Sequence, residues 1–286
     1  MTAPPAARPI QRAGHIGYVD NRFCGRGVFG ELAATTRGPI DLLLLAVGVR
    51  DLPAGDLELF RCMALCLCSP DARVWPLKLT RTLAAYGNPY AGFFGAQLAN
   101  HSDRMGPGTA SNGAASLAWI AALVGPDPDD AAVDAAVARH LAERGRIAGF
   151  GVPFRPEDER LVALTRMLAD HPATGRRHWR LHLQVVTAMR AREGLPPNIV
   201  VALAALLLDV GLAPHRAGLF LSLIMAPSFA AHAVEAADHG PELQELPAEV
   251  IDYQGAAPRR SPAEAARVAV RTGGAGSAAT RRCLSW

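Results

Sequence analysis

Residues 196–211 read PPNIVVALAALLLDVG, the most apolar stretch of the chain. The two prolines interrupt helical structure before this stretch, and Asn198 beside Pro197 is a suitable N-cap for a new helix. The apolar run from Ile199 to Leu208 is far too short to span a bilayer. The stretch therefore predicts a buried helix over Asn198–Val210.

On both sides of this stretch, the chain consists of Ala/Leu-rich segments with helical patterns, divided by Gly and Pro. Strand-like alternation is nearly absent, so the sequence predicts an all-α, multi-helix protein. The other predicted helices are Ile40–Val47, Leu57–Cys66, Leu77–Tyr86, Ser111–Val124, Asp129–Gly145, Pro156–Asp170, Arg177–Glu193, Pro214–Met225 and Pro227–Asp238.

The composition excludes several classes of protein. The chain has 286 residues with 50% hydrophobic side chains, enough for a large core, and 19% charged residues, which is not typical of a disordered chain. The net charge is only +3, and no basic stripe with interleaved aromatics suggests nucleic-acid binding. The N-terminus lacks the apolar region of a secretory signal. We expect a soluble, cytoplasmic protein without nucleic-acid or membrane partners.

The five cysteines include three in one short segment, Cys62, Cys66 and Cys68. An odd cysteine count without an export signal is typical of reduced thiols. No nearby His or carboxylate has zinc-ligand spacing, so no metal site is expected. Cys62 and Cys66 are spaced for one helix face and Cys68 lies off it, and we interpret the three as small apolar residues of a buried helix.

Five segments with recognisable motifs follow one another in the second half of the chain, about residues 106–255. Gly106-Pro107 leads into Asn112-Gly113-Ala114, and Gly149–Pro153 is followed by Asp158-Glu159-Arg160. The remaining segments are Asn198-Ile199-Val200 with its helix, Ala231-His232-Ala233-Val234-Glu235, and Tyr253-Gln254-Gly255.

These segments resemble, in order, motifs of the citrate synthase and citryl-CoA lyase superfamily: Gly-Pro-x-His-Gly-Gly-Ala, Gly-x-Gly-His-Pro with Asp-Pro-Arg, Asn-Val-Asp, Ala-His-x-x-Glu and a closing Tyr-x-Gly. The first half resembles the family only loosely. The resemblance implies a large helical domain over 23–255 with a smaller subdomain at roughly 126–215. Residues 1–22 are expected to form a flexible arm and 256–286 a disordered tail.

The resemblance also implies a chemistry, acyl-CoA-dependent formation or cleavage of a carbon–carbon bond on a citrate-like acid. Coenzyme A or an acyl-CoA would be a substrate, and no covalently bound cofactor is expected. Proton removal beside a thioester needs a carboxylate base, and the resulting enol needs a hydrogen-bond donor. The family uses two His and one Asp for these steps. Here Ser111, Val152 and Val200 align with those catalytic positions, so the usual acid–base groups are replaced.

Other family polar positions are lost or kept. Met225 aligns with a substrate arginine, and no arginine stands before the closing Tyr-x-Gly, where Gln244–Leu246 lies. Arg160 aligns with a substrate-carboxylate arginine, Arg155 with a basic residue that faces coenzyme A phosphates, and Asn198 with a coenzyme-loop asparagine. Ion pairing would equally explain the two arginines, and helix capping would explain the asparagine.

Three further polar residues have competing interpretations. His101 is a weak candidate for a replacement acid or base, but a triad with its sequence neighbours Ser102 and Asp103 lacks the required spatial convergence. His232 fits a hydrogen-bonded structural histidine. Asp209 could be a buried partner of an arginine or face the turn at Gly211.

Three functional hypotheses remain. The first is a diverged acyl-CoA carbon–carbon transferase or lyase acting on a small carboxylic acid. The second is a catalytically inactive homologue that binds or assembles, as a homodimer or with an active paralogue. The third is an enzyme of new specificity that uses His101 or Ser111. The apolar segments Trp75–Tyr86 and Phe93–Leu98 favour a dimer.

Overall fold

The structure is a computed structural model that describes residues 12–50, 52–68, 71–72, 74–101, 106–153, 155–241, 248–250, 252 and 254–255. The chain divides into two units, Met1–Glu242 and Leu243–Trp286. The described fold is all-α apart from one small sheet, as predicted. Its α-helices are α1 (Ala33–Thr35), α2 (Pro39–Ala46), α3 (Leu57–Leu67), α4 (Trp75–Ala84), α5 (Pro89–Asn100), α6 (Gly108–Val124), α7 (Asp130–Arg144), α8 (Glu159–Met167), α9 (Arg177–Glu193), α10 (Ile199–Asp209), α11 (Pro214–Ile224) and α12 (Ala226–His239).

Helix starts follow from side chains that cap free backbone N–H groups. Asn88, Asp129, Asp158 and Asn198 each accept a hydrogen bond from the first turn of α5, α7, α8 and α10, respectively. These caps explain why α8 begins at Glu159 and not at Pro156, and why α10 begins where the sequence predicted.

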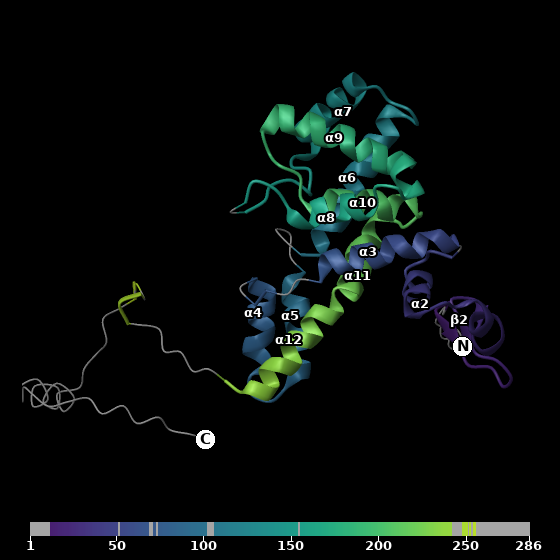
Figure 1. Cartoon of the computed structure of the whole chain (residues 1–286), viewed down its shortest axis with the longest axis vertical. Coiled ribbons are helices and arrows are strands. Elements are labelled where there is room, and N and C mark those ends of the chain that lie inside the picture. Colours follow the sequence, from purple (N-terminus) through teal and green to yellow (C-terminus); the bar gives the residue numbers. More distant parts are fainter. Residues whose placement is uncertain are drawn as a thin grey trace, which may run out of the picture. The chain divides into compact units, whose positions relative to one another are not determined.

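Helix α10 lies in the core of the first unit. All its residues from Ile199 to Leu207 except Val200 are buried, with at most 2% of the surface exposed. It packs against α6, α9, α8 and α11 and shares a core cluster with residues of α3 (Figure 1). A helix that is apolar all round is buried all round, as its sequence indicated.

Helices α11 and α12 follow each other so closely that Pro214–His239 forms one 26-residue helix. By length and composition alone this helix could cross a membrane, and half of its most apolar window is buried in the fold. Its first part packs on α6 and its second part packs on α4 and α5, which lie beside it (Figure 1). We therefore interpret it as a helix of the protein core.

A three-stranded antiparallel sheet, β1 (Gly14–His15), β2 (Arg22–Phe23) and β3 (Arg26–Gly27), lies where no strand was predicted. The π-helix η1 (Val28–Leu32) follows it, and the Asp20 carboxylate accepts the N–H groups of Phe29 and Gly30 at 2.7 and 3.3 Å. Part of the predicted arm 1–22 is thus structured from Gly14 onward. Two-residue strands leave too little alternation to detect in a sequence.

Short helices complete the described elements: η2 (Ala54–Asp56), η3 (Pro172–Gly175) and, in the second unit, η4 (Ala248–Val250). The predicted tail 256–286 lies outside the described residues.

Candidate functional site

The first turn of α10 is fixed by a network of hydrogen bonds around Asn198. Its Oδ1 accepts the Val200 N–H at 3.0 Å, and its Nδ2 donates to the Gly151 carbonyl at 3.0 Å. The Asn198 N–H donates to the Gly149 carbonyl at 2.8 Å, and the Gly151 N–H donates to the Pro196 carbonyl at 2.7 Å. Asn198 therefore caps α10 and also holds the glycine loop that leads to Val152.

Asp158 joins the same turn to the start of α8. Its carboxylate is 2% exposed and accepts three hydrogen bonds from Arg160, one from the backbone N–H and two from the guanidinium Nε and Nη2 at 2.9 and 2.8 Å. Its Oδ2 also accepts the Ile199 N–H at 2.9 Å. Burial alone would raise the pKa of Asp158, but these donors outweigh it and hold the pKa below its usual value.

The two candidate anion-binding arginines are both paired within the chain. The Arg160 side chain is still 43% exposed, and its Nη1 makes no hydrogen bond among the described residues. Arg155 pairs with Glu159 on the surface, with more than half of each side chain exposed. Asp158 thus fixes one edge of the Arg160 guanidinium and leaves the other edge for solvent or a ligand.

Val200 faces helix α6 at the position where a catalytic carboxylate was expected. A Cβ built on Gly113 would lie 3.4 Å from a Val200 methyl group, 3.2 Å from the Ala148 carbonyl oxygen and 3.7 Å from the Ala204 Cβ. Val200 is partly buried against the main core. Val152 is also partly buried, and it follows Gly151, which is hydrogen-bonded to Asn198 and Pro196. Neither valine can transfer a proton.

The Ser111 side chain makes a hydrogen bond between two packed helices. Its Oγ accepts the Gly218 N–H of α11 at 2.9 Å, and a Cβ on Gly218 would lie only 2.8 Å from the Pro107 carbonyl oxygen. Ser111 thus joins α6 to α11 where the two helices approach closely. Met225 lies at the junction of α11 and α12 and packs against two core clusters.

His101 makes no hydrogen bond to the residues around Val200 in the part of the chain that the structure describes. His101 is exposed at the end of α5, and within the described part of the chain its ring makes no hydrogen bond. Its neighbours Ser102 and Asp103 lie outside the described residues. His232 has its Nδ1 3.5 Å from Arg81, which also pairs with Glu235 at 3.1 Å. This agrees with a structural role for His232.

Asp209 caps a second helix, contrary to both interpretations from the sequence. Its oxygens accept the N–H groups of His178 and Trp179 at 2.9 Å, and Oδ1 lies 2.8 Å from the His178 Nδ1. It therefore binds the start of α9 and neither an arginine nor the turn at Gly211. Nearby, Asp56 accepts two hydrogen bonds from Arg176 at 2.6 and 2.8 Å, a pair that the sequence did not reveal.

The cysteine interpretation is confirmed for Cys62 and Cys66 and is wrong for Cys68, which follows the last turn of α3 and is exposed. Cys62 and Cys66 are buried on α3, where burial raises the pKa of each thiol, and Cys68 is exposed at the helix end. Buried protonated thiols of this kind are unreactive.

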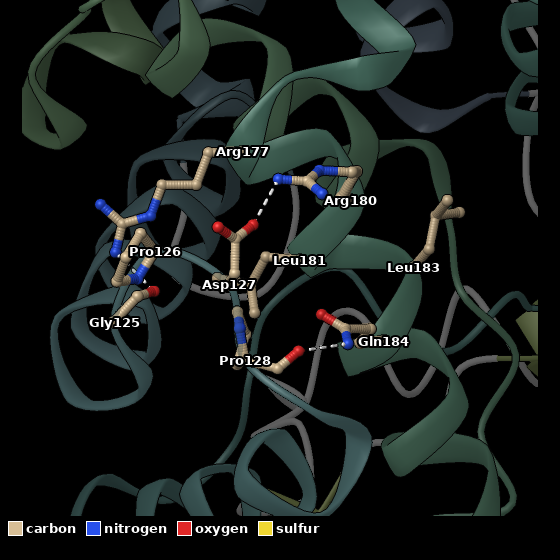
Figure 2. Close-up of a pocket in the computed structure, with 9 residues that line it drawn as sticks. All are labelled: Gly125, Pro126, Asp127, Pro128, Arg177, Arg180, Leu181, Leu183 and Gln184. Atoms are coloured by element: carbon tan, nitrogen blue, oxygen red, sulfur yellow. Dashed lines mark hydrogen bonds and ion pairs between the residues drawn. The ribbon is translucent and has the colours of Figure 1, made fainter.

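A hollow beside α9 lies between the loop Gly125–Pro128 and the first turns of the helix (Figure 2). Arg180 pairs with Asp127 at 2.9 Å, Gln184 donates to the Pro128 carbonyl at 3.1 Å, and Arg177 donates to the Gly125 carbonyl at 2.9 Å. These polar groups satisfy one another and hold the loop after α6. The hollow is therefore best explained as a structural junction.

This arrangement of helices is the fold seen in solved structures of citryl-CoA lyase and citrate synthase. The solved structure of citryl-CoA lyase from Hydrogenobacter thermophilus matches with a TM-score of 0.72 and 18% identity, over 90% of this chain and 98% of that one. ATP citrate lyase from Methanothrix soehngenii, in complex with citrate and coenzyme A, matches with a TM-score of 0.68 and 17% identity, over 92% of this chain and 43% of that one.

Citrate synthase from Thermotoga maritima matches less well, with a TM-score of 0.57 and 16% identity, over 77% of this chain and 58% of that one. No model of a known protein family and no curated protein sequence matches the chain. The likeness therefore lies in the fold, and it includes the first half of the chain, where the sequence resemblance was loose.

Proposed function

We propose that this chain is a citryl-CoA-lyase-like protein in which the acid–base site is replaced, and that it works by binding a ligand and a partner subunit without breaking or forming a carbon–carbon bond. The observation that carries the proposal is the packing of Val200 beside Gly113. The base of an enolisation would have to stand at Val200, and an alkyl side chain fills that place.

The polar groups around Val200 do not supply a substitute. Asp158 is buried and accepts hydrogen bonds from Arg160 and Ile199, which keep it ionised but leave no free path to a substrate proton. The Asn198 side chain is already hydrogen-bonded to the Val200 N–H and the Gly151 carbonyl. Removing one group from a catalytic set that acts together already abolishes most of the rate.

The same residues support the binding of an anion. Asp158 orients the guanidinium of Arg160, whose exposed edge can still donate to a carboxylate. Arg155 lies at the surface on the same segment, where a phosphate could replace Glu159 as its partner. Coenzyme A, an acyl-CoA or a citrate-like acid is the ligand that we propose, because a solved structure with this fold holds citrate and coenzyme A.

Ligand binding is expected to raise the melting temperature without turnover. Coenzyme A, acetyl-CoA and citrate would each be added in a thermal-shift titration, and a ligand at 100 times its dissociation constant stabilises the native state by about 2.7 kcal/mol. Arg155→Gln should reduce the shift with coenzyme A. The matched control is Arg139→Gln, which breaks a similar exposed pair with Glu143 on α7. No shift with any of the three ligands would contradict the proposed ligand.

The partner surface is an exposed apolar face on α4 and α5. Tyr90, Phe94 and Leu98 are spaced four residues apart on α5, and each is more than half exposed. Tyr86 at the end of α4 is exposed as well. Single exposed apolar residues are common on proteins, but a contiguous stripe marks an interface. We propose a homodimer through this face, or a heteromer with a related active subunit.

Phe94→Glu is expected to convert this dimer into a monomer, because a charge at the centre of an apolar interface is desolvated without a partner. Light scattering at micromolar concentration measures the mass. Leu65→Glu on α3 is the control, since Leu65 is similarly exposed and lies on a different helix. A wild-type monomer, or a dimer unaffected by Phe94→Glu, would show that the interface lies elsewhere.

The second candidate is retained carbon–carbon chemistry on citryl-CoA or a similar thioester. It is favoured by the match over 98% of the length of a citryl-CoA lyase. The base would then have to come from outside the three replaced positions. Direct assay of turnover separates this candidate from the binding protein.

A further inference from the structure

A second hollow lies in the N-terminal part of the chain, far along the sequence from the first turn of α10. It has a volume of about 640 Å³ and is bordered by residues of β3, η1, α1 and α2 and by the connection after α2. Ligand pockets of proteins commonly have volumes of this order. Two features of the lining indicate which ligand would fit.

The floor of the hollow is apolar. Leu32, Leu44, Leu45 and Val49 line it and are almost completely buried. Val49 is held in place because its N–H donates to the Leu44 carbonyl at 2.9 Å. Burial of a ligand's apolar surface against this floor makes binding more favourable. A small hydrophilic anion such as phosphate has no apolar surface to bury there.

The rim is cationic. Arg26 pairs with Glu31 at 2.6 Å, and Arg37 pairs with Asp41 at 3.1 Å, so these two arginines are compensated within the chain. Arg50 also lines the hollow and is exposed, and it has no hydrogen bond or ion pair among the described residues. Within the described part of the chain, the Arg50 guanidinium is thus unpaired at the edge of an apolar cavity.

We propose that this hollow binds a small carboxylate with an apolar body, with the carboxylate on Arg50 and the apolar part on the leucine floor. A guanidinium binds a carboxylate through two charge-assisted hydrogen bonds, whereas an ammonium head group would be repelled. This site is separate from the turn around Val200, and it does not depend on the function proposed for that turn.

The test uses three probes that differ only in the head group: octanoate, 1-octanol and octylamine. Each is titrated into the full chain by calorimetry. Octanoate should bind more tightly than octanol, and octylamine should bind least. Arg50→Gln should weaken octanoate binding about tenfold, which corresponds to about 1.4 kcal/mol, and should leave octanol binding unchanged.

Two variants complete the design. Arg146→Gln removes another exposed arginine, away from the hollow, and should not change octanoate binding. Leu42 lines the hollow and is partly exposed, so the larger side chain of Leu42→Trp should occupy the cavity. This variant should bind neither octanoate nor octanol. The proposal is overturned if wild-type protein does not bind octanoate at about 1 mM, if Arg50→Gln has no effect, or if octylamine binds as well as octanoate.

Discussion

Asp158→Ala is expected to lower the free energy of unfolding by about 3 kcal/mol, because three stabilising interactions are lost together. The change removes the cap of α8, which contributes about 1 kcal/mol. It also leaves the buried N–H of Ile199 without its acceptor, at a cost of about 1–3 kcal/mol. The unpaired Arg160 is partly exposed, so solvent screens its charge and it adds little.

Urea unfolding of wild type and variant measures this loss. Asp129→Ala is the matched control, because Asp129 caps only α7 and is exposed, and it should lose about 1 kcal/mol. Equal losses in the two variants would mean that Asp158 does not join α8 to α10 in the way described.

The second large effect is a loss of stability in acid that arises from a buried histidine. His182 on α9 is 2% exposed, and its Nδ1 has no hydrogen-bond partner among the described residues. Burial lowers the pKa of His182 from 6.5 to about 4. The unfolded chain therefore takes up a proton at a higher pH than the folded chain does, so stability is complete above about pH 6.5 and falls as the pH approaches 4.

Between pH 7 and pH 4.5 this single group should cost about 2–3 kcal/mol of unfolding free energy. His182→Leu removes the titration and should flatten that part of the profile. Urea unfolding at the two pH values gives the difference for each protein. Asp158 does not contribute here, since its lowered pKa places its own effect below pH 3.8. Identical profiles would show that His182 is not buried as a neutral ring.

The sequence predicted the helices well where a cap or a proline marks a start. Asn198 after two prolines placed α10 correctly, and the apolar face of α7 placed that helix. Helix α5 was missed, although Asn88-Pro89 carries the same signal, with the Asn88 side chain accepting the Ala91 N–H at 3.1 Å. No helix was predicted between Tyr86 and Ser111.

The candidate site was predicted in part, through the order of its motifs. The motifs singled out Asn198, Val200 and Arg160, and the structure joins them through Asp158 and the first turn of α10. Contacts between distant segments could not be predicted. Asp158 binds Ile199 41 residues away, and Ser111 binds Gly218 107 residues away. Nothing local in the sequence distinguishes such a carboxylate or hydroxyl from a free one.

These contacts also explain how the site differs from a catalytic one. The polar side chains kept near Val200 have structural roles, because Asn198 caps α10 and Asp158 ties α8 to α10. Restoring an aspartate at position 200 would therefore add one group without its acid–base partners. Catalytic groups that act as a unit do not contribute additively.

The most direct test of the account is an assay of the purified chain for cleavage of citryl-CoA and for citrate formation from acetyl-CoA and oxaloacetate. Each missing general acid or base is worth about 10²–10⁴ in rate, so we expect no turnover above the uncatalysed reaction. Val200→Asp should be equally inactive. Robust turnover by the wild-type protein, reduced by Arg160→Gln, would contradict the proposal and establish a carbon–carbon lyase or synthase with a different base.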